Sequence, residues 1–399
     1  MPDENQRLRL EEAIPVSVAR TVLVPCLTAV ILTLPFAGAS RAMADTVYPL
    51  PPSSTAIQDA LRYLRGQQGN DGSIGTYSDS AWACIAIAAA GEDPHDWKNG
   101  GPSLVDYLKE GPPDPFDEFN MGTFLSRMVL AAVAANEDPS AFGRWSGSDA
   151  GVEIEDGDYL SALKSLHDGT QFLQDLTGDP DSANTLNEDF WAVRALIAAG
   201  ESPNSPIIDS TLDHIIDFQE TDGGWTWGTP EHSWYEAGSS DVDNTAAAIV
   251  ALCLGTRGAS DAVQNALTYL QMNQHVSGGF ESIWLGVNVQ STAWAVDAIR
   301  AAGGNPVGSE WTPVSMHPID NLLAAQDGDG SFGESIRSSA DAVAVLVGSG
   351  YPPGSADETS ASGTARLGIE TASLLPWLVL AGIVGLIVLI ARRRFSRGA

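Results

Sequence analysis

The chain has 399 residues, of which 51 are Asp or Glu and only 20 are Lys or Arg, so its formal net charge is −31 at pH 7. A surface this acidic repels phosphate groups, which excludes nucleic acid as a partner. Three cysteines, and six histidines without metal-ligand spacing, indicate neither a disulfide framework nor a metal site, and we expect no cofactor.

The first 44 residues predict a signal peptide. An apolar run over residues 22–39 follows Arg20, and Ala42-Met43-Ala44 forms a small-x-small cleavage site. We therefore expect export with cleavage after Ala44. The leader before Arg20 is long and contains four acidic residues, so an uncleaved N-terminal anchor is the alternative.

The C-terminal end predicts a membrane anchor. Residues 374–391 form an apolar run at the short end of what a membrane-spanning helix needs. The arginine-rich tail that follows, 392–399, is expected in the cytoplasm. Residues 354–373 are small and polar and indicate a flexible stalk. The predicted location is thus the cell membrane, single-pass, with the main domain, 45–353, outside.

The main domain consists of six copies of one unit. In the clearest copy Gln274 is followed by Gly278 four residues later and by Phe280 two residues after that. The same spacing starts at Gln68, Gln219 and Gln326. The copies end at residues 91, 136, 200, 256, 303 and 350, and such a period predicts a repeat architecture.

Each copy predicts two helices. The second half of the unit is rich in Ala and long apolar residues, opens with Ser, Thr or Asp, and ends at a Gly in four copies: Gly91, Gly200, Gly303 and Gly350. Twelve helices in six hairpins can form an open solenoid or a closed ring. Six copies favour closure, so the predicted fold is all-α, an α6/α6 toroid of six helical-hairpin repeats.

This unit resembles the repeat of squalene cyclases and protein prenyltransferase β subunits. The resemblance covers nearly all of residues 45–353 and implies a terpenoid cyclase-like α-α barrel. It is specific for architecture and weak for activity, because the same toroid also occurs in cobalamin carriers. The Asp and Cys zinc ligands of the prenyltransferases, separated by one residue, have no counterpart around Cys84 or Cys253.

One segment resembles a catalytic motif. Residues 241–246 read Asp-Val-Asp-Asn-Thr-Ala and are similar to the Asp-x-Asp-Asp-Thr-Ala motif of class II terpene cyclases, whose middle Asp protonates an alkene or epoxide. The resemblance makes Asp243 the candidate general acid, although Asn244 stands where the family has its third Asp. The alternative is helix capping, since the equivalent positions are all polar: Ser78, Thr123, Asn187, Gln290 and Arg337. In a closed ring we expect these positions to meet at one mouth.

Aromatic residues crowd the fourth copy. Together with the polar positions above they form the predicted ligand-binding set: Trp225, Trp227, Trp234, Tyr235, Trp284, Asp241, Asp243, Gln290 and Arg337. Such a set suits an apolar or sugar-stacking pocket framed by acidic groups. Packing of Ala-rich helices is the alternative use of these aromatics, and of the tryptophans that share another repeat position: Trp82, Trp191 and Trp294.

Three functions are compatible with these features of the sequence. The export signals and the missing catalytic sets favour a membrane-tethered extracellular binding or interaction module, for an apolar small molecule or a glycan, and not an enzyme. The first alternative is a class II terpene cyclase-like enzyme with Asp243 as general acid. The second is a purely structural surface module. No feature of the sequence indicates the oligomeric state.

Overall fold

The structure, a computed structural model, describes residues 46–112, 120–144, 146–149, 151–236, 238–282 and 285–350. These residues belong to the second of the two units into which the chain divides, Asp45–Ala399. The predicted signal peptide (1–44), stalk (354–373), membrane span (374–391) and basic tail (392–399) all lie outside the described residues.

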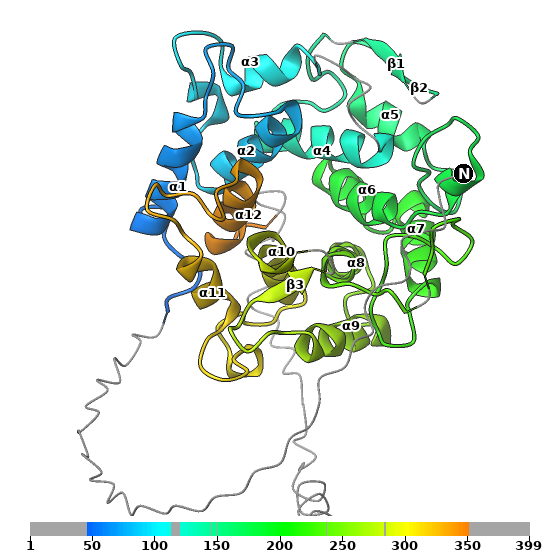
Figure 1. The fold of residues 1–399 in the computed structure, drawn as a ribbon. Coiled ribbons are helices and arrows are strands. Elements are labelled where there is room, and N and C mark those ends of the chain that lie inside the picture. Colours follow the sequence, from blue (N-terminus) through cyan, green and yellow to red (C-terminus); the bar gives the residue numbers. More distant parts are fainter. Residues whose placement is uncertain are drawn as a thin grey trace, which may run out of the picture. The chain divides into compact units, whose positions relative to one another are not determined.

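Six helices form the inner wall of a closed ring. Each packs against the next along the chain, and the last packs against the first (Figure 1). Their many alanines let neighbouring helices approach closely, and most of their side chains are buried. The inner helices are α2 (Tyr77–Ala89), α4 (Met121–Ala134), α6 (Asn187–Ala198), α8 (Val242–Leu254), α10 (Val289–Ala301) and α12 (Ile336–Leu346). The predicted closure into an α/α toroid is confirmed.

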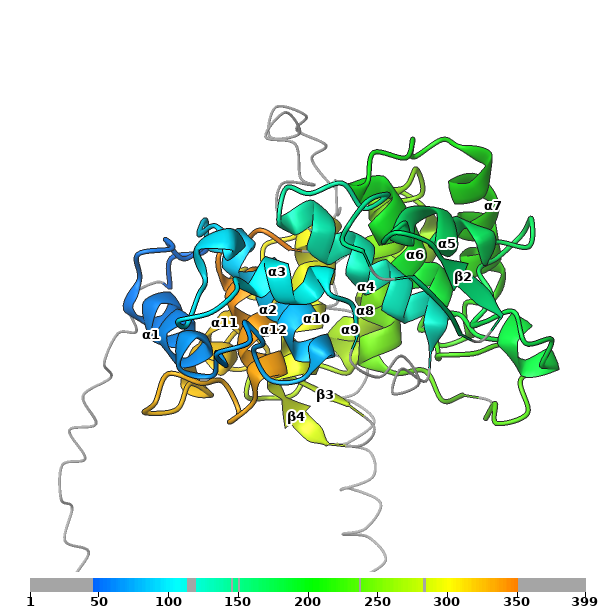
Figure 2. The ribbon, with the colours of Figure 1, turned by 90° about the horizontal axis from the view of Figure 1, so that it is seen from above.

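Six further helices form the outer layer. Each packs against the inner helix that precedes it, and the first, α1, packs against α12 and so joins the two ends of the repeat array (Figure 2). The outer helices are α1 (Thr55–Gly66), α3 (Leu104–Lys109), α5 (Tyr159–Ser165), α7 (Pro206–Asp217), α9 (Asp261–Met272) and α11 (Pro318–Ala324). Short 3₁₀ turns stand at Pro94–Asp96 (η1), Pro180–Ala183 (η3) and Ser309–Trp311 (η4).

Two antiparallel hairpins extend the loops between helices. Strands β1 (Gly147–Asp149) and β2 (Val152–Ile154) precede α5. Strands β3 (Phe280–Ser282) and β4 (Gly286–Asn288) pair with Phe280 opposite Asn288, and β4 leads directly into α10. The second hairpin therefore stands at the N-terminal end of an inner helix.

The repeated glutamine explains why the copies join into a ring. In each of four copies its side-chain amide donates to the carbonyl of the turn glycine four residues later and to a carbonyl of the following repeat. For Gln326 the second acceptor is the carbonyl of Ala56 in α1, at 2.8 Å. The amide thus satisfies buried backbone groups within one repeat and between repeats, and that of Gln326 links the last copy to the first.

The helix ends follow the predicted glycines with one exception. Gly91, Gly200 and Gly303 have φ of 80°, 91° and 76°, the left-handed conformation expected just after a helix. In the last copy α12 ends at Leu346, so the residue after its C-cap is Gly348 (φ 72°), two residues before the predicted Gly350.

The inner helices begin at the same mouth of the ring. Asn120, the N-cap of α4, donates a hydrogen bond to Glu188 in the first turn of α6. Ser291 in the first turn of α10 lies near enough to Asp243 in the first turn of α8 for its hydroxyl to lower the pKa of that carboxyl group. Neighbouring inner helices are therefore parallel, as the alternation of outer and inner helices requires.

The sequence predicted a single-pass protein of the cell membrane, and this prediction is wrong. Over the described part of 46–350, no helix is long and apolar enough to cross a bilayer. The longest, α4, has 14 residues. At 1.5 Å per residue it would reach only about 21 Å, against a hydrocarbon core of about 30 Å. The prediction depended on residues 374–391, which lie outside the described residues.

Candidate functional site

Asp243 lies in the first turn of α8 but does not cap the helix. The N-cap is Asp241, whose carboxylate accepts hydrogen bonds from the backbone N–H of Asn244 at 2.8 Å and from its side-chain amide at 2.7 Å. The caps of α10 and α12, Asn288 and Ser335, are likewise two residues ahead of the position equivalent to Asp243. The capping interpretation of Asp243 is therefore wrong, because Asp241 fills that role.

The carboxyl group of Asp243 is poorly solvated. Its Oδ1 atom is buried and has no hydrogen-bond partner among the residues that the structure describes. The pKa of Asp243 is raised to about 6: burial is the largest cause, the Ser291 hydroxyl lowers the pKa, and the carboxylates of Asp241 and Asp341 add to the rise. Such a group can hold or release a proton close to neutral pH.

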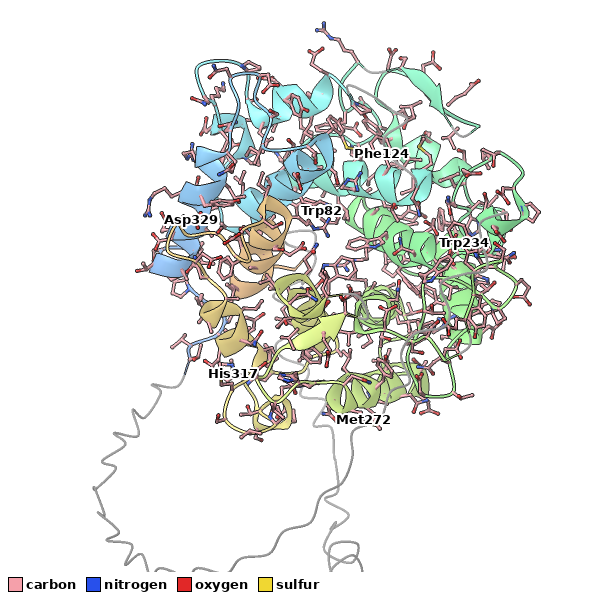
Figure 3. The ribbon with its side chains drawn as sticks, viewed as in Figure 1. Trp82, Phe124, Trp234, Met272, His317 and Asp329 are labelled. Carbon is pink, nitrogen blue, oxygen red and sulfur yellow. The ribbon has the colours of Figure 1, made fainter. Side chains whose placement is uncertain are left out.

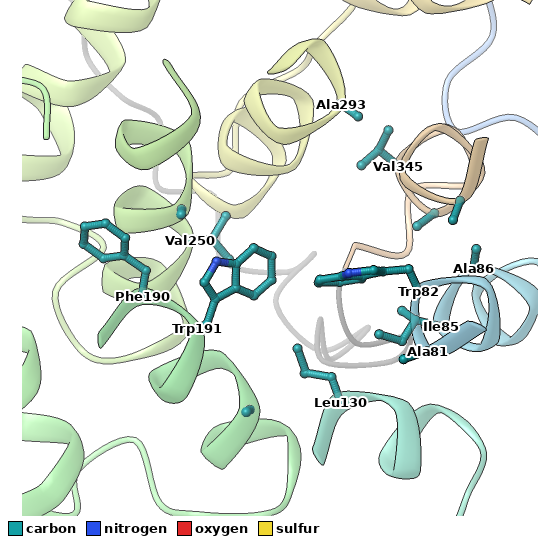
Figure 4. Close-up of a cluster of buried hydrophobic side chains, with 14 of the residues drawn as sticks. Ala81, Trp82, Ile85, Ala86, Leu130, Phe190, Trp191, Val250, Ala293 and Val345 are labelled. Atoms are coloured by element: carbon teal, nitrogen blue, oxygen red, sulfur yellow. The ribbon is translucent and has the colours of Figure 1, made fainter. Parts of the chain in front are cut away.

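Three indoles fill the centre of the ring one helical turn farther from the mouth. The ring centroids of Trp82 and Trp191 lie 5.3 Å apart, as do those of Trp191 and Trp294, both in edge-on contact. These residues come from α2, α6 and α10, which are separated along the wall by α4 and α8, so their contacts cross the ring interior. Figure 4 shows Trp82 and Trp191 pointing toward one another.

A buried ion pair crosses the interior one turn deeper. A terminal nitrogen of Arg194 in α6 lies 2.5 Å from a carboxylate oxygen of Asp297 in α10, and both side chains are almost fully buried, at 4% and 2% exposure. Asp297 also contacts Arg300 at 3.1 Å. The interior of the ring at these two levels is thus occupied by side chains of the protein itself.

Arg337 lies at the mouth above the indoles. It stands in the first turn of α12, its Nε–H donates to Asp341 at 2.8 Å, and its guanidinium carbon lies 3.6 Å from the centre of the Trp82 ring. Gln290 holds the equivalent place in α10, and no residue in the described ranges hydrogen-bonds its side chain. Asp243, Gln290 and Arg337 are therefore brought to one mouth.

The aromatic residues of the fourth copy are dispersed. Trp225 is fully buried, and its indole N–H donates to the carbonyl of Ile215 at 2.7 Å, so it belongs to the core. Trp234 is 81% exposed and lies at the periphery, whereas Trp82 lies at the ring interior (Figure 3). Trp227 packs edge-on against His232, with ring centroids 4.4 Å apart.

Tyr235 donates its hydroxyl to Glu220 at 2.5 Å, and this hydrogen bond raises the pKa of Tyr235 to about 12. Trp284 lies outside the described residues. Trp227 and Trp234 share His232 as a partner, the centroids of the His232 and Trp234 rings lying 6.2 Å apart, and the described aromatic side chains of the predicted set do not converge on Asp243. Only the backbone of Trp225 approaches the motif, through a β-bridge to Asp241.

Two open pockets flank the β3–β4 hairpin. The larger, of about 580 Å³, lies between the hairpin, the start of α10, α11 and the start of α12. Among the residues that the structure describes, its polar lining consists of amides and hydroxyls and includes no charged group: Asn288, Gln290, Asn321, Ser335 and Ser338. The smaller, of about 350 Å³, contains Asp241, Tyr269 and Glu281. Neither of these two pockets is lined by Asp243.

Sequence reasoning missed most of the larger pocket. Asn288 and Ser335 are the caps of two successive inner helices, and only the closing of repeat six onto repeat five gives them a common pocket. The available signal was their equivalent place in the repeats, both two residues ahead of the predicted polar position. The stacking of Arg337 on Trp82 was also missed, because these residues are far apart in the sequence.

Comparison with known proteins supports the architecture. The family described as squalene-hopene cyclase C-terminal domain matches residues 182–287, about a quarter of the chain, from η3 to β4. No curated protein sequence matches the chain.

Solved structures of terpene cyclases share the fold. Two variants of the type II terpene cyclase MstE from Scytonema, one with its product merosterolic acid A and one with its substrate geranylgeranyl dihydroxybenzoate, each match with a TM-score of 0.50. Both are 15% identical to this chain and cover 75% of it and 97% of their own length. An ent-copalyl diphosphate synthase from Streptomyces platensis has a TM-score of 0.44 at 18% identity, covering 68% of this chain and 49% of that one. The predicted resemblance to the terpenoid cyclase-like toroid is confirmed at the level of the fold.

Proposed function

We propose that this chain is a binding protein that takes a small neutral ligand at the mouth of the toroid. The observation that carries the proposal is the larger pocket, about 580 Å³, which opens beside the β3–β4 hairpin above an interior that indoles and an ion pair already occupy. A pocket of this volume is in the range of small-molecule sites.

The chemistry of the lining favours a carbohydrate over a hydrocarbon. None of the described residues that line the pocket is charged, although the chain carries 51 acidic residues. Its amides and hydroxyls can both donate and accept, which suits the hydroxyl groups of a sugar. Leu285, which is 70% exposed, and Val287 supply an apolar surface for the C–H face of the ring. A neutral glycan is therefore the ligand class that we propose.

The test is binding of neutral oligosaccharides to the full-length chain, first on a glycan array and then by titration calorimetry with the best binder. Gln290→Ala should weaken binding about tenfold or more, because it removes a free amide from the pocket while leaving the helix intact. Gln264→Ala, at an exposed glutamine of the outer helix α9, is the matched control and should bind as the wild type does. Absence of any neutral binder, or equal effects of the two variants, would refute the proposal.

Asp243 supports a second candidate function, protonation of an isoprenoid alkene. Its unpartnered buried oxygen, its pKa of about 6 and the Asp-Val-Asp-Asn-Thr-Ala motif all suit a proton donor, and the squalene-hopene cyclase match includes this segment. The proton given to the first alkene is returned by loss of another at the end, so the product would be an isomer of the substrate.

Incubation with geranylgeranyl dihydroxybenzoate, followed by chromatography of the extract, tests this second candidate. Wild type should yield a cyclised isomer, and Asp243→Asn should yield none while it still folds. If the wild type leaves the substrate unchanged, or if Asp243→Asn forms the same product, Asp243 is not a general acid. Glycan binding would be unaffected by either result, since Asp243 does not line the neutral pocket.

A further inference from the structure

An internal cation already occupies the upper face of the indole cluster. The guanidinium of Arg337 lies 3.6 Å from the centre of the Trp82 ring and 5.8 Å from that of Trp294. A cation over an indole face is attracted by the negative face of the ring, and the attraction grows as water is removed. Here Trp82 is only 4% exposed, so the stack is largely shielded from solvent.

The same guanidinium serves a buried carboxylate. Its Nε–H donates to Asp341 at 2.8 Å, and the side chain of Asp341 is fully buried while that of Arg337 is 20% exposed. A buried carboxylate is costly without a compensating positive charge. The place above the indoles therefore combines two requirements, a flat cation for the aromatic face and an N–H donor for Asp341.

Arg337 can leave this place without disturbing the wall of the ring. It stands in the first turn of α12, just after the N-cap Ser335, and its side chain already reaches solvent at the mouth. Rotation about its side-chain bonds would uncover the indole face that it now covers and would leave the backbone of the helix in place.

We propose that the indole cluster with Asp341 is a binding site for an organic cation, an alkylguanidinium or alkylammonium group, and that Arg337 is its internal occupant. A ligand of this class supplies the positive charge and the N–H donor that Arg337 now supplies. The site is separate from the neutral pocket, whose lining does not include Trp82, Arg337 or Asp341. The inference therefore does not depend on the proposed glycan.

A second arginine stacks on a tryptophan outside the ring interior and provides a matched control for Arg337. The guanidinium of Arg65 lies 4.0 Å from the centre of the Trp97 ring and contacts Glu92 at 2.9 Å. This pair has the same chemistry, but the side chains of Arg65 and Glu92 are 47% and 35% exposed, and a single indole takes part. Removal of Arg65 should leave a solvated carboxylate and no site.

The experiment is an isothermal calorimetric titration of the full-length chain with methylguanidinium. Wild type should bind weakly, because the ligand must displace Arg337, and Arg337→Ala should bind at least tenfold more tightly. Arg65→Ala should bind as the wild type does. The double variant Arg337→Ala with Asp341→Asn should lose the gain, because the carboxylate that neutralises the ligand is gone.

Circular dichroism and a thermal melt establish that each variant is folded, and Arg337→Gln replaces Arg337→Ala if the latter unfolds. Addition of methylguanidinium should also raise the melting temperature of the Arg337 variant and leave that of Arg65→Ala unchanged. The inference is overturned if the folded Arg337 variant binds no better than the wild type, or if Arg65→Ala gains as much.

Discussion

The centre of the ring and its mouth are built from the same six helices but differ in how their polar and aromatic side chains are paired. At the centre, three indoles and an ion pair make contacts between helices that are not neighbours, and all of these side chains are buried except that of Trp294, which is partly buried. At the mouth, one turn away, neither Asp243 Oδ1 nor the Gln290 amide has a hydrogen-bond partner among the described residues, and Gln290 lines an open pocket. We infer from this difference that the centre stabilises the ring, and that a ligand would be recognised from the mouth, at the open pocket or at the indole face that Arg337 covers.

The largest effect should come from breaking the buried ion pair. Asp297→Ala should lower the free energy of unfolding by about 3–5 kcal/mol, because it removes the buried carboxylate that pairs with Arg194 and also contacts Arg300. Chemical denaturation measures the change. Arg257→Ala is the control, since its partners Asp209 and Asp213 are exposed at 53% and 63%, and it should cost less than about 1 kcal/mol. If the two variants lost equal amounts of stability, the Arg194–Asp297 pair would have to be solvated rather than buried.

The indole layer should give the next largest effect. Trp191→Ala should destabilise the fold by about 3 kcal/mol, because it removes the ring that contacts both Trp82 and Trp294 and leaves a cavity. Trp234→Ala, at an exposed indole, should change stability by less than about 0.5 kcal/mol. Thermal denaturation of the two variants decides whether the centre stabilises the ring as proposed, since similar melting temperatures would contradict it.

At the mouth, the effect of Asp243 on stability should depend on pH. Its folded pKa, about 6, lies above the usual Asp value, so the contribution of the protonated acid is fully present below about pH 4 and is lost as pH rises through 6. Asp243→Asn should therefore match the wild type near pH 4 and be more stable by about 1–2 kcal/mol at pH 8, allowing for residual solvent. Denaturation at the two pH values measures this, and a difference independent of pH would refute the raised pKa.

The smallest effect on stability should come from the neutral pocket. Gln290→Ala should change the free energy of unfolding by less than about 0.5 kcal/mol, because no described residue hydrogen-bonds its side chain. The same variant should weaken glycan binding, so binding and stability separate at this position. A large loss of stability would show that Gln290 stabilises the fold, and would contradict the difference between the centre and the mouth.

The repeats were predictable because local chemistry repeats in the sequence. The spacing of Gln274 to Gly278 reflects an amide that bonds the carbonyl of that glycine, a contact made within five residues. The same holds for Gly91 and Gly303, whose left-handed conformation depends only on the end of their own helix. The capping interpretation of Asp243 failed by two residues, since polar residues at 241 and 243 look alike in the sequence.

By itself, the sequence determined the all-α repeat architecture, the number of copies and the polar character of the positions at the start of each inner helix, because these depend on contacts within one repeat or between adjacent repeats. Only the tertiary structure decided which side chains meet. Arg337 and Trp82 are 255 residues apart by their numbers, and they touch because α12 packs on α2. The filled centre follows from that closure, whose long-range contacts no local spacing encodes, whereas the open pocket at the mouth forms where the adjacent repeats five and six pack together.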